Sequence, residues 1–247
     1  MKKIAFHIQK GGVGKTSLSG NISAYLSGNY KTVLIDADPQ GNSSSWFITD
    51  QKVKFELADV LQGNCQLTDA LVKITDSFYL FPTFGIGGSL KLYSENKLND
   101  EPFIFEDLCN ELEKQLFQVC IFDLSPGMSR LEKSVLLCVD EVITPLTPEY
   151  FSLDGIEIFN NELKKINKSF RRDINHKKIV LNNLNKSFNR HLTNLEKIKR
   201  LDYDLFIIPQ DSKLAEAQSN NKSIFEYLPG SKSVPELQKL ALAIMEG

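Results

Sequence analysis

The sequence has no long hydrophobic run, and cysteine and histidine are scarce. No apolar stretch reaches the roughly 18 residues that would cross a bilayer, and the N-terminus lacks the hydrophobic segment of a signal peptide. The 4 cysteines lie at least 11 positions apart without a Cys-x-x-Cys pair, and there are 3 histidines, so no zinc or iron–sulfur site is expected within one chain. These absences favour a cytoplasmic protein without stable membrane insertion.

The net charge is close to zero, but it is unevenly distributed. The chain as a whole carries −2, whereas residues 161–200 hold 12 Lys and Arg against 3 Asp and Glu. That segment therefore carries +9 and the rest of the chain −11. Such asymmetry indicates either a face that binds a polyanion or the solvated surface of helices, and charge alone leaves both interpretations open.

Short apolar runs alternate with helical patterns along the whole chain. Strands are predicted at 3–8, 32–36, 78–82, 119–123, 141–145, 178–181 and 205–209. Helices are predicted at 16–27, 103–117, 129–138, 152–168, 188–200, 211–220 and 234–245, and a mobile loop at 83–101. This alternation predicts one α/β domain over residues 1–247, a doubly wound, mostly parallel sheet of roughly seven or eight strands with helices on both faces.

The first strand leads into a glycine-rich loop that opens a helix, Lys10-Gly11-Gly12-Val13-Gly14-Lys15-Thr16-Ser17. Glycines let backbone N–H groups surround an anion where a Cβ would collide, and the helix N-terminus faces the same point. In such a loop Lys15 reaches the β- and γ-phosphates and the Thr16 hydroxyl binds Mg²⁺. Gln9 stands where the usual pattern has its first glycine. The sequence predicts a P-loop ATPase that uses ATP and Mg²⁺.

A second lysine in this loop, Lys10, resembles the signature of the deviant Walker A family, which includes ParA, MinD and the nitrogenase iron protein. Four further segments are similar to the ParA branch and follow in its order. They are Asp-Ala-Asp-Pro-Gln-Gly-Asn at 36–42, Ile-Phe-Asp at 121–123, Pro-Glu-Tyr-Phe-Ser-Leu-Asp-Gly at 148–155 and Ile-Pro-Gln-Asp-Ser-Lys-Leu-Ala-Glu-Ala at 208–217. The resemblance covers nearly the whole chain.

This resemblance implies catalytic roles for three residues. Two subunits are expected to enclose two ATP molecules, with Lys10 reaching the partner's phosphates as an arginine finger does. Lys15 would stabilise charge on the phosphates, and Asp38 matches the carboxylate that positions the attacking water. Lys10, Lys15 and Asp38 are therefore the expected catalytic residues.

The resemblance also implies where the metal and the adenine bind. Mg²⁺ is expected near Thr16, Asp36 and Asp123. The adenine is expected near Asn182, Pro209 and Asp211. The sequence departs from the family at Gln210, which replaces an arginine, at Gln218, which replaces a proline, and at Leu124-Ser125-Pro126, which stands where many members have x-Pro-Pro.

Three uses of such an ATPase compete. An iron-protein role needs a cysteine just after residue 123, and positions 124–133 contain none. A MinD-like role in positioning cargo on a membrane or a protein assembly stays the alternative, although the C-terminal segment lacks a basic amphipathic face. DNA partitioning is favoured, with an ATP-dependent homodimer on the nucleoid and a ParB-type activator. No helix-turn-helix domain is expected, because the first strand begins at residue 3.

Non-specific DNA binding is expected to use basic residues that contact phosphates. Lys213 stands where ParA proteins carry an arginine that contacts DNA. Other candidates come from the positively charged segment: Arg171, Arg172, Lys177, Lys178, Lys186 and Arg190.

Overall fold

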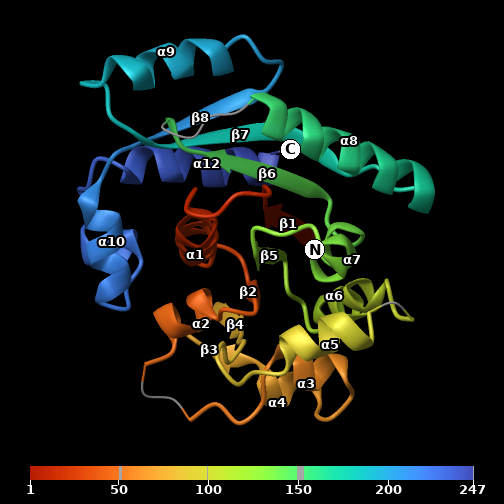
Figure 1. Ribbon diagram of the computed structural model, residues 1–247. Helices are drawn as coiled ribbons and strands as arrows, with labels where there is room; N and C mark the ends of the chain where they lie inside the picture. The colour runs from red at the N-terminus through yellow and green to blue at the C-terminus, as the bar shows by residue number, and fades with distance from the viewer. Residues whose placement is uncertain (50–51, 99, 149–152, 247) are drawn as a thin grey trace.

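Eight strands form one sheet in the part of the chain that the structure describes (Figure 1). This computed structural model describes residues 1–49, 52–98, 100–148 and 153–246. The strands are β1 (Lys2–Phe6), β2 (Thr32–Ala37), β3 (Val72–Lys73), β4 (Phe78–Phe81), β5 (Val119–Leu124), β6 (Glu141–Leu146), β7 (Asn175–Leu184) and β8 (Asp204–Pro209). Their order is β3-β4-β2-β5-β1-β6-β7-β8, and only β3 runs antiparallel to its neighbour.

Helices connect these strands and cover both faces of the sheet. They are α1 (Lys15–Leu26), α2 (Asn42–Phe47), α3 (Leu57–Leu61), α4 (Leu67–Ala70), α5 (Leu90–Asn96), α6 (Ile104–Lys114), α7 (Arg130–Leu136), α8 (Leu153–Phe170), α9 (Asn189–Ile198), α10 (Ser212–Ser219), α11 (Ile224–Tyr227) and α12 (Val234–Glu246). None of these helices is both long and apolar enough to cross a membrane, within the described residues.

Alternate residues of the central strands build two cores on opposite faces. Ile4 and Phe6 of β1 pack in a core with α1 and α12. Ala5 of the same strand packs in the other core, which takes in α3, α6, α7 and α8. A third cluster, beneath α9, contains Ile8 and Val13. The loop that follows β1 is therefore anchored by its own apolar residues.

The carboxyl ends of β1, β2 and β5 meet at one edge of the sheet. These strands are adjacent and parallel, so Asp123 of β5 lies in register with Phe6 of β1 on one side and Asp36 of β2 on the other. In open α/β sheets ligands bind outside the carboxyl ends of the strands. The acidic residues and the glycine-rich loop are thus brought together by the strand order.

The structure confirms the predicted mostly parallel sheet with helices on both faces, and each predicted strand is present. The two-residue strand β3 was not predicted, because so short a run has no period to detect. The expectation of a loop over 83–101 is wrong in its second half. Residues Leu90–Asn96 form α5, which buries Leu90 and Tyr93 in the core below α7.

Two histidines of this fold are expected to make stability depend on pH. Burial lowers the pKa of His7 to about 3 and that of His176 to about 4, from an ordinary value of 6.5. The ring of His176 contacts Thr144 Oγ1 and Asn160 Oδ1 at 2.8 and 2.7 Å. A folded-state pKa below the unfolded value means that the unfolded chain takes up the proton first. The stability that the fold gains by enclosing a neutral His176 is therefore fully present above pH 6.5 and is lost as the pH falls toward 4.

We predict that the variant His176→Gln, which has no ring to protonate, loses less stability on acidification than the wild type. Urea unfolding from about pH 7 to about pH 4 should show the free-energy difference between the two proteins shrinking as the pH falls. Parallel curves for the two proteins would contradict the assignment of a neutral, enclosed His176.

Candidate nucleotide-binding site

The loop between β1 and α1 takes a conformation that depends on glycine. Gly12 and Gly14 have φ angles of +72° and +94°, in the left-handed region that side chains disfavour. A Cβ on Gly14 would lie 2.1 Å from Asn182 Nδ2. That amide donates a hydrogen bond of 3.0 Å to the carbonyl of Val13, so Asn182 supports the loop from behind.

The N-terminus of α1 opens into a cavity of about 470 Å³. Gly14 caps the helix without any side chain, so the first helical N–H groups have no capping acceptor from it. The cavity is lined by Gly11, Gly12, Gly14, Lys15, Thr16, Ser17, Asp38, Gln40, Asn42, Pro126 and Gln218. Backbone N–H groups, a lysine and two hydroxyls on one concave surface form an environment suited to phosphate groups.

Lys15 provides the positive charge of this cavity. Its side chain is almost fully buried, and Nζ donates a hydrogen bond of 2.7 Å to the carbonyl of Lys10. Burial lowers its pKa, while the carboxylates of Asp123, Asp38 and Glu132 act in the opposite direction. Three acidic side chains therefore lie within electrostatic reach of one ammonium group.

Asp36 and Asp123 lie side by side but have different partners. Asp36 Oδ2 accepts hydrogen bonds of 2.7 and 2.6 Å from the backbone N–H and the hydroxyl of Ser44, so it anchors the start of α2. Asp123 Oδ2 accepts a hydrogen bond of 2.7 Å from Ser43 Oγ, whereas its buried Oδ1 has no hydrogen-bond donor among the described residues. Burial raises the pKa of both carboxyl groups, that of Asp123 to about 6.

Asp38 reaches the cavity from the end of β2. Its side chain is 7% exposed, and Oδ1 accepts a hydrogen bond of 2.9 Å from the Gln40 N–H. Burial raises its pKa, and the nearby Lys15 and the Gln40 N–H oppose that rise. The carboxylate is thus held in place at the wall of the cavity.

The residues expected around the adenine lie outside this lining. Asp211 caps α10, accepting from the Lys213 N–H at 3.1 Å and from Ser231 Oγ at 2.6 Å, so its contacts in the described structure are structural. Pro209 lines a different cavity. Gln218, which the sequence marked only as a departure from the family, lines the cavity at the N-terminus of α1 instead.

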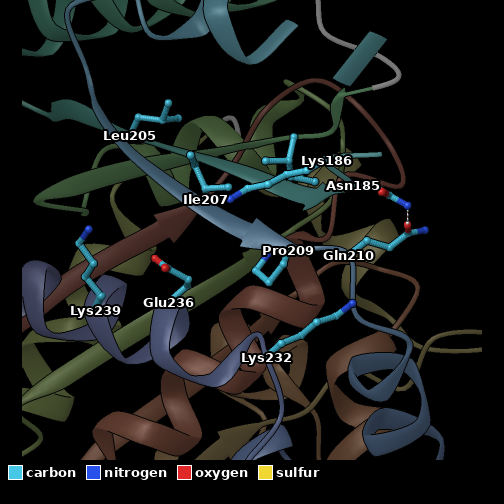
Figure 2. A pocket seen from close by; sticks show the side chains of 10 residues that line it. Asn185, Lys186, Leu205, Ile207, Pro209, Gln210, Lys232, Glu236 and Lys239 are labelled. Atoms are coloured by element: carbon cyan, nitrogen blue, oxygen red, sulfur yellow. Dashed lines mark hydrogen bonds between the residues drawn. The ribbon is translucent and has the colours of Figure 1, made fainter. Parts of the chain in front are cut away.

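A second, basic cavity of about 550 Å³ lies along β8 (Figure 2). Lys186, Lys232 and Lys239 line it from the segment after β7, the segment before α12 and α12 itself. Glu236 is the one acidic side chain of its lining. Lys232 and Lys239 were missed from the sequence, because only the fold brings them to the same cavity as Lys186.

The other basic candidates are not equivalent. Arg172 forms a two-pronged ion pair with Glu106, and Lys213 pairs with Glu216 at 2.6 Å. Lys178 is buried and pairs with Glu141 at 2.7 Å, so its inclusion among the DNA contacts is wrong. Arg171, Lys177 and Arg190 are exposed.

Much of the segment similar to ParA at 148–155 lies outside the described residues.

Comparisons with known proteins agree with this geometry. A family model described as an AAA domain matches residues 1–177. An uncharacterized protein of Borreliella burgdorferi is 46% identical over 99% of both chains. The sporulation initiation inhibitor protein Soj of Bacillus subtilis is 30% identical over 97% of this chain and 96% of its own. The crystal structure of a plasmid partition protein from Borrelia burgdorferi bound to AMPPNP has a TM-score of 0.80 at 23% identity, covering 99% of this chain and 98% of that chain.

The parallel sheet and the loop that opens α1 define the class of the protein as a P-loop NTPase. Within that class, the chain belongs to the ParA family of partitioning ATPases, to which Soj also belongs.

The geometry at Gly14 leads to a stability prediction. Gly14→Ala should cost about 1–3 kcal/mol for the left-handed backbone alone, and the Asn182 amide would also have to leave Val13. Gly11→Ala is the matched control, because its Cβ would meet no atom within 4 Å. Urea unfolding without nucleotide should show a lower midpoint for Gly14→Ala than for Gly11→Ala. If both variants lowered the urea midpoint equally, the left-handed backbone and the close contact with Asn182 would not be what makes Gly14 necessary.

Proposed function

We propose that this protein is an Mg²⁺-dependent ATPase that dimerises on ATP, binds DNA without sequence preference and acts in DNA partitioning. The observation that carries the proposal is the cavity at the N-terminus of α1, where Lys15 lies among Asp38 and Asp123. Membership of the ParA family supports the reaction class.

The cavity supports binding of the triphosphate through positioned positive charge. The N–H groups of the loop and of the first turn of α1 would face the phosphate oxygens, and Lys15 would leave the Lys10 carbonyl to reach them. Phosphoryl transfer depends chiefly on such positioning and on stabilising charge around the γ-phosphate.

Asp123 and Thr16 fit a Mg²⁺ ion. The buried Asp123 Oδ1 has no donor among the described residues, and a divalent cation would satisfy it directly or through water. Both oxygens of Asp36 already accept hydrogen bonds, Oδ2 from Ser44 and Oδ1 from the Asp38 N–H at 3.4 Å, so Asp36 suits a supporting role. When bound, Mg²⁺ would neutralise charge on the phosphates.

Asp38 and Lys10 are assigned to turnover. Asp38 lies at the cavity wall, where it can orient a water toward the γ-phosphate. Lys10 is half-buried at the start of the loop, and in the proposed dimer it contacts the phosphates held by the partner. An ammonium group supplied in this way stabilises charge that develops during transfer, as an arginine finger does.

The basic cavity along β8 is the surface we assign to DNA. Lys186, Lys232 and Lys239 are exposed and line it, which suits contact with phosphates. Lys213 lies on α10 and would have to exchange its Glu216 partner for a phosphate. Arg171 and Arg190 could add to the same electrostatic field from the exposed surface.

The alternative is a cargo-positioning ATPase that acts on a membrane or a protein assembly, and its membrane form has less support. Leu237, Leu240 and Ile244 of α12 are buried in the core with α1, so the apolar face of the C-terminal helix is occupied within the fold. A ParB-type protein remains the proposed activator of hydrolysis.

Two variants should separate nucleotide binding from turnover. Lys15→Ala removes the countercharge to the phosphates and should reduce ATP affinity beyond detection by calorimetry. Asp38→Ala should bind ATP but hydrolyse it very slowly, and light scattering should then show an ATP-dependent dimer. Undiminished affinity in Lys15→Ala would overturn the phosphate site, and a monomeric Asp38→Ala at saturating ATP would overturn the two-subunit mechanism.

DNA binding should depend on the lysines of the β8 cavity. With ATP present, Lys239→Ala should weaken binding to every DNA sequence tested and reduce the salt slope of log K by about 0.9 for each phosphate that the variant no longer neutralises. Lys114→Ala is the matched control, since it removes the same charge from α6, far from α12 (Figure 1). Equal effects of both variants would show that net charge, not this cavity, governs the binding. If the wild type ignores DNA and sediments with anionic liposomes on addition of ATP, the membrane alternative is correct.

A further inference from the structure

A buried glutamate lies under the turn that follows β5. Glu132 in the first turn of α7 is 1% exposed. Its Oε1 accepts a hydrogen bond from the Ser125 hydroxyl, and its Oε2 accepts one of 2.7 Å from the Ser129 N–H. One carboxylate therefore ties the beginning of the turn to its end.

This turn forms one wall of the nucleotide-binding site. Pro126, between the two residues held by Glu132, lines the cavity at the N-terminus of α1 together with Lys15. An adjoining cavity of about 680 Å³ has Glu132, Ser125 and Asp38 in its lining. Movement of the turn would therefore displace Pro126, which lines both cavities together with Asp38.

The packing leaves the turn little freedom. A Cβ on Gly127 would lie 3.3 Å from Glu132 Oε2 and 3.4 Å from Ser125 Oγ, so the backbone wraps closely around the carboxylate. A proline at position 125 would have no hydroxyl to donate, and Glu132 would have no hydrogen-bond donor at that end of the turn. The link between turn and helix therefore depends on the serine that this chain has there.

Glu132 also acts on the charged groups of the site. Its carboxylate acts to raise the pKa of both Lys15 and Asp38. It therefore favours the charged lysine while adding negative charge near the place where phosphates would bind.

We propose that Glu132 is a positioning residue for hydrolysis: through Ser125 and Ser129 it fixes the turn at Pro126, so that a water held by Asp38 keeps its alignment. This inference rests on the proposed ATPase function. Small displacements of positioned groups have large effects on rate, so the contribution should appear in turnover more than in binding.

The variant Glu132→Gln tests this proposal, because the amide keeps the shape but loses the charge and one acceptor. We expect kcat for ATP hydrolysis to fall by about tenfold or more, because the turn no longer keeps the water aligned. KM should be unchanged or lower, because the substitution removes a negative charge near the phosphates. The cycle Ser125→Ala, Glu132→Gln and the double variant should be non-additive, the double variant being no slower than Glu132→Gln.

Glu56 offers a matched control. It too is buried, and its carboxylate accepts from the Phe84 N–H at 2.7 Å and from the Ser89 hydroxyl at 2.8 Å, but unlike Glu132 it does not line the adjoining cavity that contains Asp38. Glu56→Gln should lose about as much thermal stability as Glu132→Gln does, while its kcat stays within about twofold of the wild-type value.

The possible outcomes are distinct. The positioning role would be overturned if Glu132→Gln had the same kcat as the wild type. It would also be overturned if Glu132→Gln and Glu56→Gln lost the same proportion of kcat. Either result would leave the ATPase function intact. A rise in KM with unchanged kcat would also overturn the positioning role. If the wild type neither binds nor hydrolyses ATP, the proposed function itself fails, and the role of Glu132 fails with it.

Discussion

Burying an ammonium group is costly unless opposite charges and hydrogen bonds compensate for the lost hydration, and Lys15 is only 7% exposed. Asp123, Asp38 and Glu132 supply the opposite charge, and the Lys10 carbonyl accepts one hydrogen bond. These groups come from three parallel strands and the helix after β5, so the sheet must form before the lysine is compensated. An arriving polyanion would replace carbonyl and carboxylate partners with phosphate oxygens. The same constraint that stabilises the loop therefore prepares it for a ligand.

The sheet edge also explains why the neighbouring acidic residues have different roles. Asp36 and Asp123 are in register on adjacent strands. Ser44 donates a hydrogen bond to Asp36, whereas Asp123 retains a buried oxygen without a donor among the described residues. Two buried glutamates, Glu132 and Glu56, hold turns through backbone N–H and hydroxyl groups. Polar groups that would be destabilising in isolation are here the fixed points of irregular backbone.

The sequence predicted those features that depend on local pattern. The strands, most long helices and the loop at 10–17 could be read directly, because strand period, glycine spacing and the Gly-Lys-Thr run are local properties. The segment 83–101 was misread, because its glycines hid the short helix α5, whose stability comes from burying Leu90 and Tyr93. The place of Lys232 and Lys239 beside Lys186 and the contact of Ser125 with Glu132 could not be predicted, since each depends on how distant segments pack. Charge counting likewise could not distinguish Lys178, buried against Glu141, from an exposed lysine.

We infer that backbone N–H groups at the N-terminus of α1 bind the phosphates of ATP. Amide hydrogen exchange, with and without Mg²⁺ and a non-hydrolysable ATP analogue, tests it without relying on turnover, dimerisation or DNA. We expect exchange to slow first and most strongly over residues 10–18. Unchanged exchange there, or protection confined to the cavity along β8, would contradict it.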